Sequence, residues 1–130
     1  MTGLLLDTHL LIAIAREEVA TLPDHIQRAL SGPAHVQFAS AGSLWEIAIK
    51  TRLGKLDPLL PLEELPAYLQ SQGITIVGID ERHAVTQANP VPATRDPFDR
   101  LLLAQCAVEN LRLVTLDRTL AGHPLAWRPP

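Results

Sequence analysis

Short apolar segments of strand length recur along the chain, and a segment with helical character follows most of them. The apolar segments cover residues 3–6, 34–39, 74–77 and 111–116. Strands that alternate with helices are typical of α/β proteins, in which helices cover both faces of a central, mostly parallel sheet. We therefore predict an α/β fold of this kind.

Helix start and stop signals fill the spaces between these segments. Asp96 reads as a helix cap and Pro97 as the first helical residue, since proline tolerates that position. Ser43 and Glu46 have the spacing of a capping box in a helix that stops at Gly54. We also predict that a helix runs from a cap at Asp80 to about residue 88, and that residues 125–127 add a short edge strand.

Composition limits the class of protein. With 130 residues, 47% of them hydrophobic, residues 1–130 are expected to form a single domain. A net charge of −3 argues against a general basic surface for nucleic acid, but not against an enzyme with its acids in one metal site. With one cysteine, no apolar run of membrane length and no secretory signal, the sequence indicates a cytoplasmic protein and no membrane partner.

Four acidic residues stand beside apolar segments, where a carboxylate is expected to be partly buried and to need a partner. Asp7 and Asp117 follow predicted strands, whereas Glu46 and Asp99 lie in early turns of predicted helices. In an alternating βα fold these positions share the edge at the carboxyl ends of the strands, where open α/β sheets bind ligands. We therefore expect the four carboxylates to form one site.

Clustered carboxylates repel one another unless a cation lies between them. Oxygen-only ligands favour Mg²⁺ or Mn²⁺ over zinc. Such an ion activates water and stabilises a phosphate during displacement, so the sequence indicates phosphodiester hydrolysis.

Each acid also has a simpler interpretation. Asp7 can cap the first helix, Glu46 can complete the capping box with Ser43, and Asp117 can be a turn acid. Two other functions stay open: a non-catalytic module that grips a basic partner, and a phosphate-handling α/β hydrolase such as a phosphatase. His9 stands where an aspartate-nucleophile phosphatase would carry a second Asp.

Several neighbouring residues are candidate auxiliaries. Thr8, Thr115 and Asp96 can support the acids, although each also reads as a cap or an ordinary strand residue. His9 is expected to be a surface or core histidine rather than a base. Basic residues that can contact phosphates flank the acidic segments, namely Lys50, Arg52, Lys55, Arg95, Arg100 and Arg118.

The chain resembles PIN-domain ribonucleases, in particular the VapC-type toxins of type II toxin–antitoxin systems. The resemblance rests on residues 4–9 (LLLDTH), 43–50 (SLWEIAIK), 54–56 (GKL), 95–102 (RDPFDRLL) and 113–117 (LVTLD), which occur in the family's order. It implies a Mg²⁺- or Mn²⁺-dependent endoribonuclease that acts on RNA, forms a homodimer and is silenced by a cognate antitoxin.

The resemblance also implies roles for residues. Asp7, Glu46, Asp99 and Asp117 match the family's catalytic and metal-binding acidic quartet, and Asp96 is then a cap or an auxiliary. Two positions depart from the family's pattern: Thr94 replaces a frequent His, and Leu116 replaces a small or polar residue. These departures leave the quartet intact and concern details of substrate contact.

Overall fold

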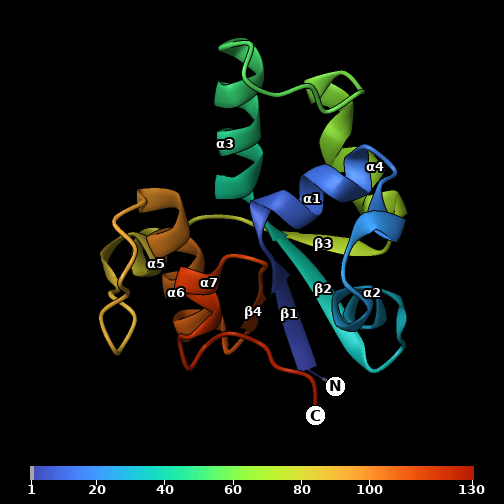
Figure 1. Cartoon of the computed structure of the whole chain (residues 1–130). Coiled ribbons are helices and arrows are strands. Elements are labelled where there is room, and N and C mark those ends of the chain that lie inside the picture. The colour runs from blue at the N-terminus through green and yellow to red at the C-terminus, as the bar shows by residue number, and fades with distance from the viewer. Residues whose placement is uncertain (1) are drawn as a thin grey trace.

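The computed structural model describes residues 2–130, whose strands form one parallel sheet. The strands are β1 (Thr2–Leu6), β2 (His35–Ser40), β3 (Ile74–Val77) and β4 (Arg112–Val114). Their order is β3-β2-β1-β4, and every pairing between neighbours is parallel. The predicted α/β architecture with a parallel sheet is confirmed (Figure 1).

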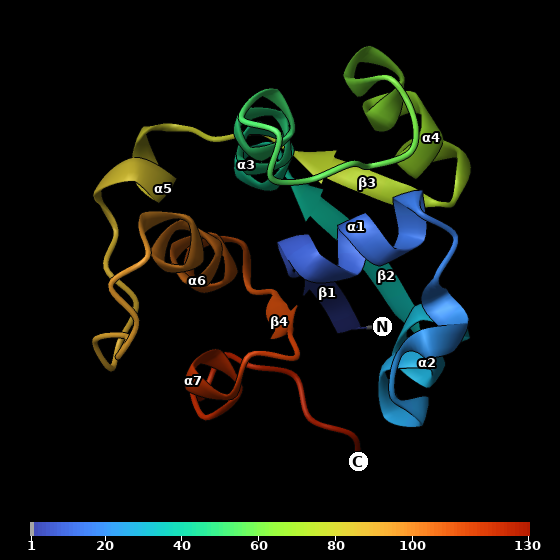
Figure 2. The same cartoon turned by 45° about the horizontal axis from the view of Figure 1, so that its top comes forward.

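Helices connect the strands and surround the sheet (Figures 1 and 2). They are α1 (Thr8–Ala15), α2 (Asp24–Ser31), α3 (Ala41–Arg52), α4 (Leu65–Ser71), α5 (Glu81–Val85), α6 (Pro97–Glu109) and α7 (Arg118–Ala121). Short 3₁₀ turns lie at Val19–Thr21 and Leu62–Glu64. Within residues 2–130, no helix has the length and apolar character needed to cross a lipid bilayer.

Alternating leucines in β1 divide the core into two layers. Leu4 and Leu6 pack with residues of α1, α2 and α4, whereas Leu5 packs with residues of α6 and α7. In Figure 1 the first group of helices lies to the right and the second to the left. Because successive side chains of a strand point to opposite faces, the sheet is buried on both faces, as predicted.

The N-terminus of α3 differs from the prediction. The helix begins at Ala41, and the side chain of Ser40 accepts a hydrogen bond of 3.0 Å from the N–H of Gly42, so Ser40 is the cap. Ser43 and Glu46 both lie inside the helix and form no capping box. The physical reason is that β2 ends at Ser40, whose hydroxyl is the first one available to the new helix.

Three other boundaries are shorter than predicted. The helix capped by Asp80 ends at Val85, because Thr86 is extended and Ala88 is buried in the layer with α6. β4 ends at Val114, where its partner β1 also ends and the chain of β1 turns into α1. The tail contributes only one bridge, between Ala126 and Leu113.

We expect Ser40→Ala to lower the free energy of unfolding by about 1 kcal/mol, because the substitution removes the cap of α3. The hydroxyl is fully buried, so water replaces the lost partner of the Gly42 N–H poorly. Urea unfolding followed by circular dichroism measures the change. Ser31→Ala, at the exposed end of α2, is the matched control and should leave the midpoint unchanged. An unchanged midpoint for Ser40→Ala would contradict the assigned cap.

Candidate metal centre

The carboxyl edge of the sheet carries a small acidic cavity of about 110 Å³. Asp7 directly follows β1, α3 follows β2, and Asp117 lies three residues after β4. The structure brings the four acids expected to cluster, together with the three neighbours Thr8, His9 and Asp96, to this one cavity. Its lining comprises Asp7, Thr8, His9, Ile12, Glu46, Lys50, Asp96, Asp99 and Asp117.

Asp7 is both a helix cap and a member of the cavity. Its Oδ1 accepts a hydrogen bond of 3.1 Å from the N–H of His9 and caps α1. Its Oδ2 accepts a hydrogen bond from the Thr115 hydroxyl. Each carboxylate oxygen has two lone pairs, so both oxygens can still bind a cation. Capping and metal binding are therefore compatible roles for this residue.

Glu46 projects from the second turn of α3 and is almost fully buried. The Thr8 hydroxyl donates to its Oε1 at 2.9 Å, and the Thr8 oxygen lies 2.9 Å from Ser43 Oγ. Since Thr8 has a single hydroxyl proton, the Ser43 hydroxyl must donate to Thr8. The other oxygen of Glu46, Oε2, lies 2.7 Å from Lys50 Nζ.

Asp96 and Asp99 stand at the N-terminus of α6. Asp96 caps the helix through a bond of 2.8 Å from the Phe98 N–H, with Pro97 as the first helical residue, as predicted. Asp99 Oδ2 accepts a longer bond of 3.4 Å from the Thr94 hydroxyl. Thr94 therefore contacts a candidate metal ligand directly.

The electrostatics of Asp99 show how crowded the acids are. Burial, and after it the charges of Asp96, Asp7, Asp117 and Glu46, together raise the pKa of its carboxyl from 3.8 to about 6. With this pKa the carboxyl is mostly ionised at neutral pH, so it bears most of the repulsion from the neighbouring acids. A bound cation would relieve that repulsion.

Asp117 caps α7, a short helix that was not predicted, although an aspartate is a favoured cap. Its Oδ1 accepts a bond of 2.8 Å from the Thr119 N–H, and its own N–H donates to Thr115 Oγ1 at 3.0 Å. Because the Thr115 hydroxyl also donates to Asp7, one threonine links the two acids that follow β1 and β4.

The donor set fits a hard divalent cation. Every acidic group in the cavity offers carboxylate oxygens, and no cysteine lines it. Hard oxygen ligands suit Mg²⁺ and Mn²⁺, which usually keep several of their waters. At about 30 Å³ for each water, the cavity volume is sufficient for an ion with part of its hydration shell.

The basic residues named from the sequence lie in different places. Within residues 2–130, Lys50 is the one lysine or arginine that lines the cavity. Contact with Glu46, and the charges of Asp96 and Asp99, raise the pKa of the Lys50 ammonium. Arg100 instead donates to the backbone oxygen of Thr94 at 2.8 Å and holds the loop before α6. The spacing of Glu46 and Lys50, four residues apart in one helix, was a sequence signal for their pairing.

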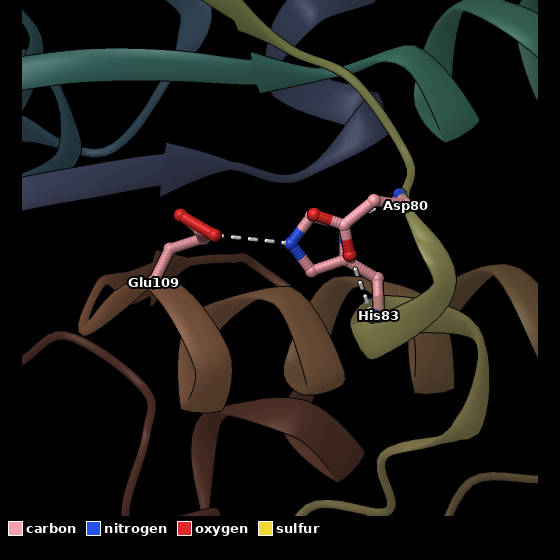
Figure 3. A group of neighbouring side chains, drawn as sticks. All are labelled: Asp80, His83 and Glu109. Atoms are coloured by element: carbon pink, nitrogen blue, oxygen red, sulfur yellow. Dashed lines mark hydrogen bonds and ion pairs between the residues drawn. The ribbon is translucent and has the colours of Figure 1, made fainter.

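A second group of possible metal ligands lies between α5 and α6 (Figure 3). Asp80, His83 and Glu109 each offer one ligand atom within 4.8 Å of the others. In Figure 3 the imidazole faces Glu109, which stands at the end of α6, and Asp80 lies beside the ring at the start of α5. This spacing alone is compatible with an ion.

The hydrogen bonds of that group oppose metal binding. His83 Nδ1 accepts the Asp80 N–H at 3.0 Å, so its proton is on Nε2 and faces Glu109 Oε1 at 3.2 Å. Arg82 Nη2 lies 2.9 Å from both carboxylates, and this contact lowers the pKa of Asp80 to about 2. The guanidinium already supplies the positive charge, so we interpret the group as a latch between α5 and α6.

One comparison with known proteins found a match. A family model described as the PIN domain matches residues 4–123, nearly the whole chain. No curated protein sequence matches the chain.

We expect Asp99→Asn to stabilise the metal-free protein at about pH 7.5. The folded-state pKa of Asp99 is raised to about 6 from 3.8, so ionised Asp99 opposes folding. That opposition is complete above the folded-state pKa, shrinks as pH falls through it, and vanishes below the unfolded-state pKa.

Urea unfolding in EDTA at a series of pH values measures the difference between Asp99→Asn and the parent protein. The difference should narrow as the pH falls from about 6 to about 4. Glu63→Gln, at an exposed acid outside the cavity, should leave the pH profile of the parent unchanged. A constant difference across this range would contradict the electrostatic description of the cavity.

Proposed function

The chain belongs to the PIN domain family, and we propose that it is a Mg²⁺- or Mn²⁺-dependent endoribonuclease that hydrolyses RNA phosphodiester bonds. The observation that carries the proposal is the convergence of Asp7, Glu46, Asp99 and Asp117 on one cavity at the carboxyl edge of the sheet. Members of this family are generally metal-dependent nucleases, and the carboxylate oxygens of these four acids agree with that chemistry.

Each acid has a role in this proposal. Asp7 and Asp99 are the main metal ligands, and Glu46 and Asp117 complete the site or orient the attacking water. When bound, the ion supplies an activated water and neutralises charge on the phosphate. Thr115 holds the carboxylate of Asp7 in place through its hydroxyl.

Thr8 has the corresponding role for Glu46, through a hydrogen bond of 2.9 Å. The other supporting residue is Asp96, which caps α6 and thereby places Asp99 in the first turn of that helix. Partners that fix the orientation of metal ligands usually affect both metal affinity and activity. We therefore propose Thr8, Thr115 and Asp96 as positioning residues.

Two other functions fit the chain less well. A module that grips a basic partner would use exposed acids, whereas Asp7 and Glu46 are buried. A phosphatase with an aspartate nucleophile would carry a second Asp two residues after the first, where this chain has His9. Metal-free binding without cleavage would support the first alternative, and covalent phosphorylation of Asp7 would support the second.

We further propose that residues 1–130 act as one domain and that the protein is a VapC-type toxin. In that role it would work in the cytoplasm, and a cognate antitoxin would cover the acidic cavity. Two core layers that share one sheet support a single folding unit. The basis for the toxin role is the similarity of the five sequence segments to that family.

A homodimer is part of the proposal, and an exposed aromatic side chain on α3 supports it. Three of the chain's five aromatic residues pack against the core, namely Phe38, Tyr68 and Trp127. The other two pair with each other: the rings of Trp45 and Phe98 lie 5.8 Å apart, and Trp45 is 61% exposed. Exposed aromatic residues are enriched in protein interfaces.

Chelation of divalent ions should abolish RNA cleavage, and added Mg²⁺ or Mn²⁺ should restore it. We expect Asp7→Asn and Asp99→Asn to reduce the cleavage rate by about 100-fold or more, because each removes a charged metal ligand. The measurement is the cleavage of a panel of structured and unstructured RNAs on denaturing gels, with and without Mg²⁺.

Two variants control this experiment. Asp24→Asn, at an exposed acid on α2, has the same chemical change outside the cavity and should keep full activity. Glu109→Gln removes an acid of the latch between α5 and α6, and it should retain metal-dependent cleavage. Cleavage that persists in EDTA, or in both cavity variants, would count against the proposed nuclease.

Trp45→Glu should weaken self-association by about tenfold or more, because it places a charge in the proposed apolar contact. Sedimentation equilibrium of the parent protein and the variant measures the dissociation constant. Val85→Glu is the control, since Val85 is 83% exposed but lies on α5. A parent protein that sediments as a monomer would refute the dimer and leave the nuclease proposal intact.

A further inference from the structure

Lys50 has an unusual position for a charged side chain. It lies one helical turn after Glu46 on α3, and its Nζ is 2.7 Å from Glu46 Oε2. Within the described chain it is the one lysine or arginine among the residues that line the acidic cavity. Lys50 therefore supplies the positive charge nearest to the proposed metal ligands.

Glu46 has both oxygens engaged by the protein itself. Oε1 accepts the Thr8 hydroxyl at 2.9 Å, and Oε2 is paired with the Lys50 ammonium. Thr8 in turn accepts from Ser43, so the position of Oε1 is set by two buried hydroxyls. The partner of Oε2 differs, because the ammonium stands at the end of a flexible side chain.

Asp7 and Asp99 are held by hydrogen bonds from neutral donors. Asp7 is bonded by the His9 N–H and the Thr115 hydroxyl, and Asp99 by the Thr94 hydroxyl. These neutral donors leave lone pairs free for a cation. An ammonium differs, since it carries a positive charge that repels an incoming ion.

We infer that Lys50 is a tethered counter-ion that competes with the divalent metal for Glu46. In the metal-free protein it neutralises a carboxylate that is only 7% exposed. An ion that takes Oε2 as a ligand comes close to the ammonium, and the repulsion between the two positive charges favours displacement of the lysine. The lysine side chain is 45% exposed and can move outward into solvent.

This inference rests on the proposed function, since it takes Glu46 as part of the metal site. A displaced Lys50 remains within one side-chain length of Glu46, so its charge stays available to a phosphate of the RNA substrate. Lys50 would then compensate the charge of Glu46 in the metal-free protein and the charge of the phosphate when the metal is bound.

Metal-binding calorimetry on the full chain, stripped with EDTA and free of RNA, tests the inference with Mn²⁺ as the probe. Lys50→Met keeps the apolar stem and removes the charge. We expect it to bind Mn²⁺ on the order of tenfold more tightly, which corresponds to about 1.4 kcal/mol. The same variant should unfold at a lower urea concentration in EDTA, because buried Glu46 has lost its partner.

Matched variants separate competition from other effects. Lys50→Arg keeps the charge and should bind Mn²⁺ nearly as the parent does. Lys55→Met removes an exposed lysine just beyond α3, outside the cavity, and should leave the affinity for Mn²⁺ unchanged. In a Glu46→Gln background, the gain from Lys50→Met should disappear. Lys50→Gln serves as a second neutral variant if Lys50→Met fails to fold.

Three results would overturn the inference. The first is equal or weaker Mn²⁺ binding by both neutral variants, which would leave Lys50 with a purely structural role. The second is a gain that persists in the Glu46→Gln background, which would indicate a general charge effect. The third is a parent protein that binds no Mn²⁺, and this result would also remove the proposed function.

Measuring Mn²⁺ binding apart from RNA cleavage separates the competition by Lys50 from the proposed nuclease activity. If the parent binds Mn²⁺ and cleaves RNA but Lys50→Met shows no gain, the nuclease stands and the competition fails. If Lys50→Met shows the gain but the parent cleaves no RNA, the competition stands and the nuclease fails.

Discussion

The repulsion among carboxylates at the carboxyl edge of the sheet is the constraint on which the rest of the site depends. Five acids, Asp7, Glu46, Asp96, Asp99 and Asp117, line a cavity of about 110 Å³ together with a single lysine. Their charges contribute to the raised pKa of Asp99. Such a cluster is unfavourable for folding by itself, which supports the proposal that the cavity takes up a positively charged ligand.

The protein holds these acids in position with hydroxyl groups and helix caps. Thr115 bonds to Asp7 and to the backbone of Asp117, and Thr8 bonds to Glu46. Asp7 and Asp117 are also caps of α1 and α7, so the helix termini that begin at this edge stabilise negative charge. Capping and ligand positioning are therefore carried out by the same side chains.

The parallel sheet explains why residues so distant in sequence meet. All strands end at the same edge, and the two leucine-rich layers fix the helices that start there. The latch of Asp80, His83 and Glu109 connects α5 to α6, and Arg82 supplies the positive charge between its two carboxylates. Spacing of ligand atoms alone therefore does not distinguish a metal site from a charge-balanced structural contact.

The sequence by itself determined the fold class and the set of acids that meet, because strand-length apolar segments and the acids beside them are local patterns. The prediction from sequence misplaced the cap of α3, where Ser40 rather than Ser43 is used, and it missed α7. Only the tertiary structure decided the partners of each acid, such as Thr115 for Asp7 and Thr94 for Asp99. The reason is physical: Asp7 and Thr115 are brought into contact by the pairing of β1 with β4, and sequence separation says nothing about which neighbouring strands will pair.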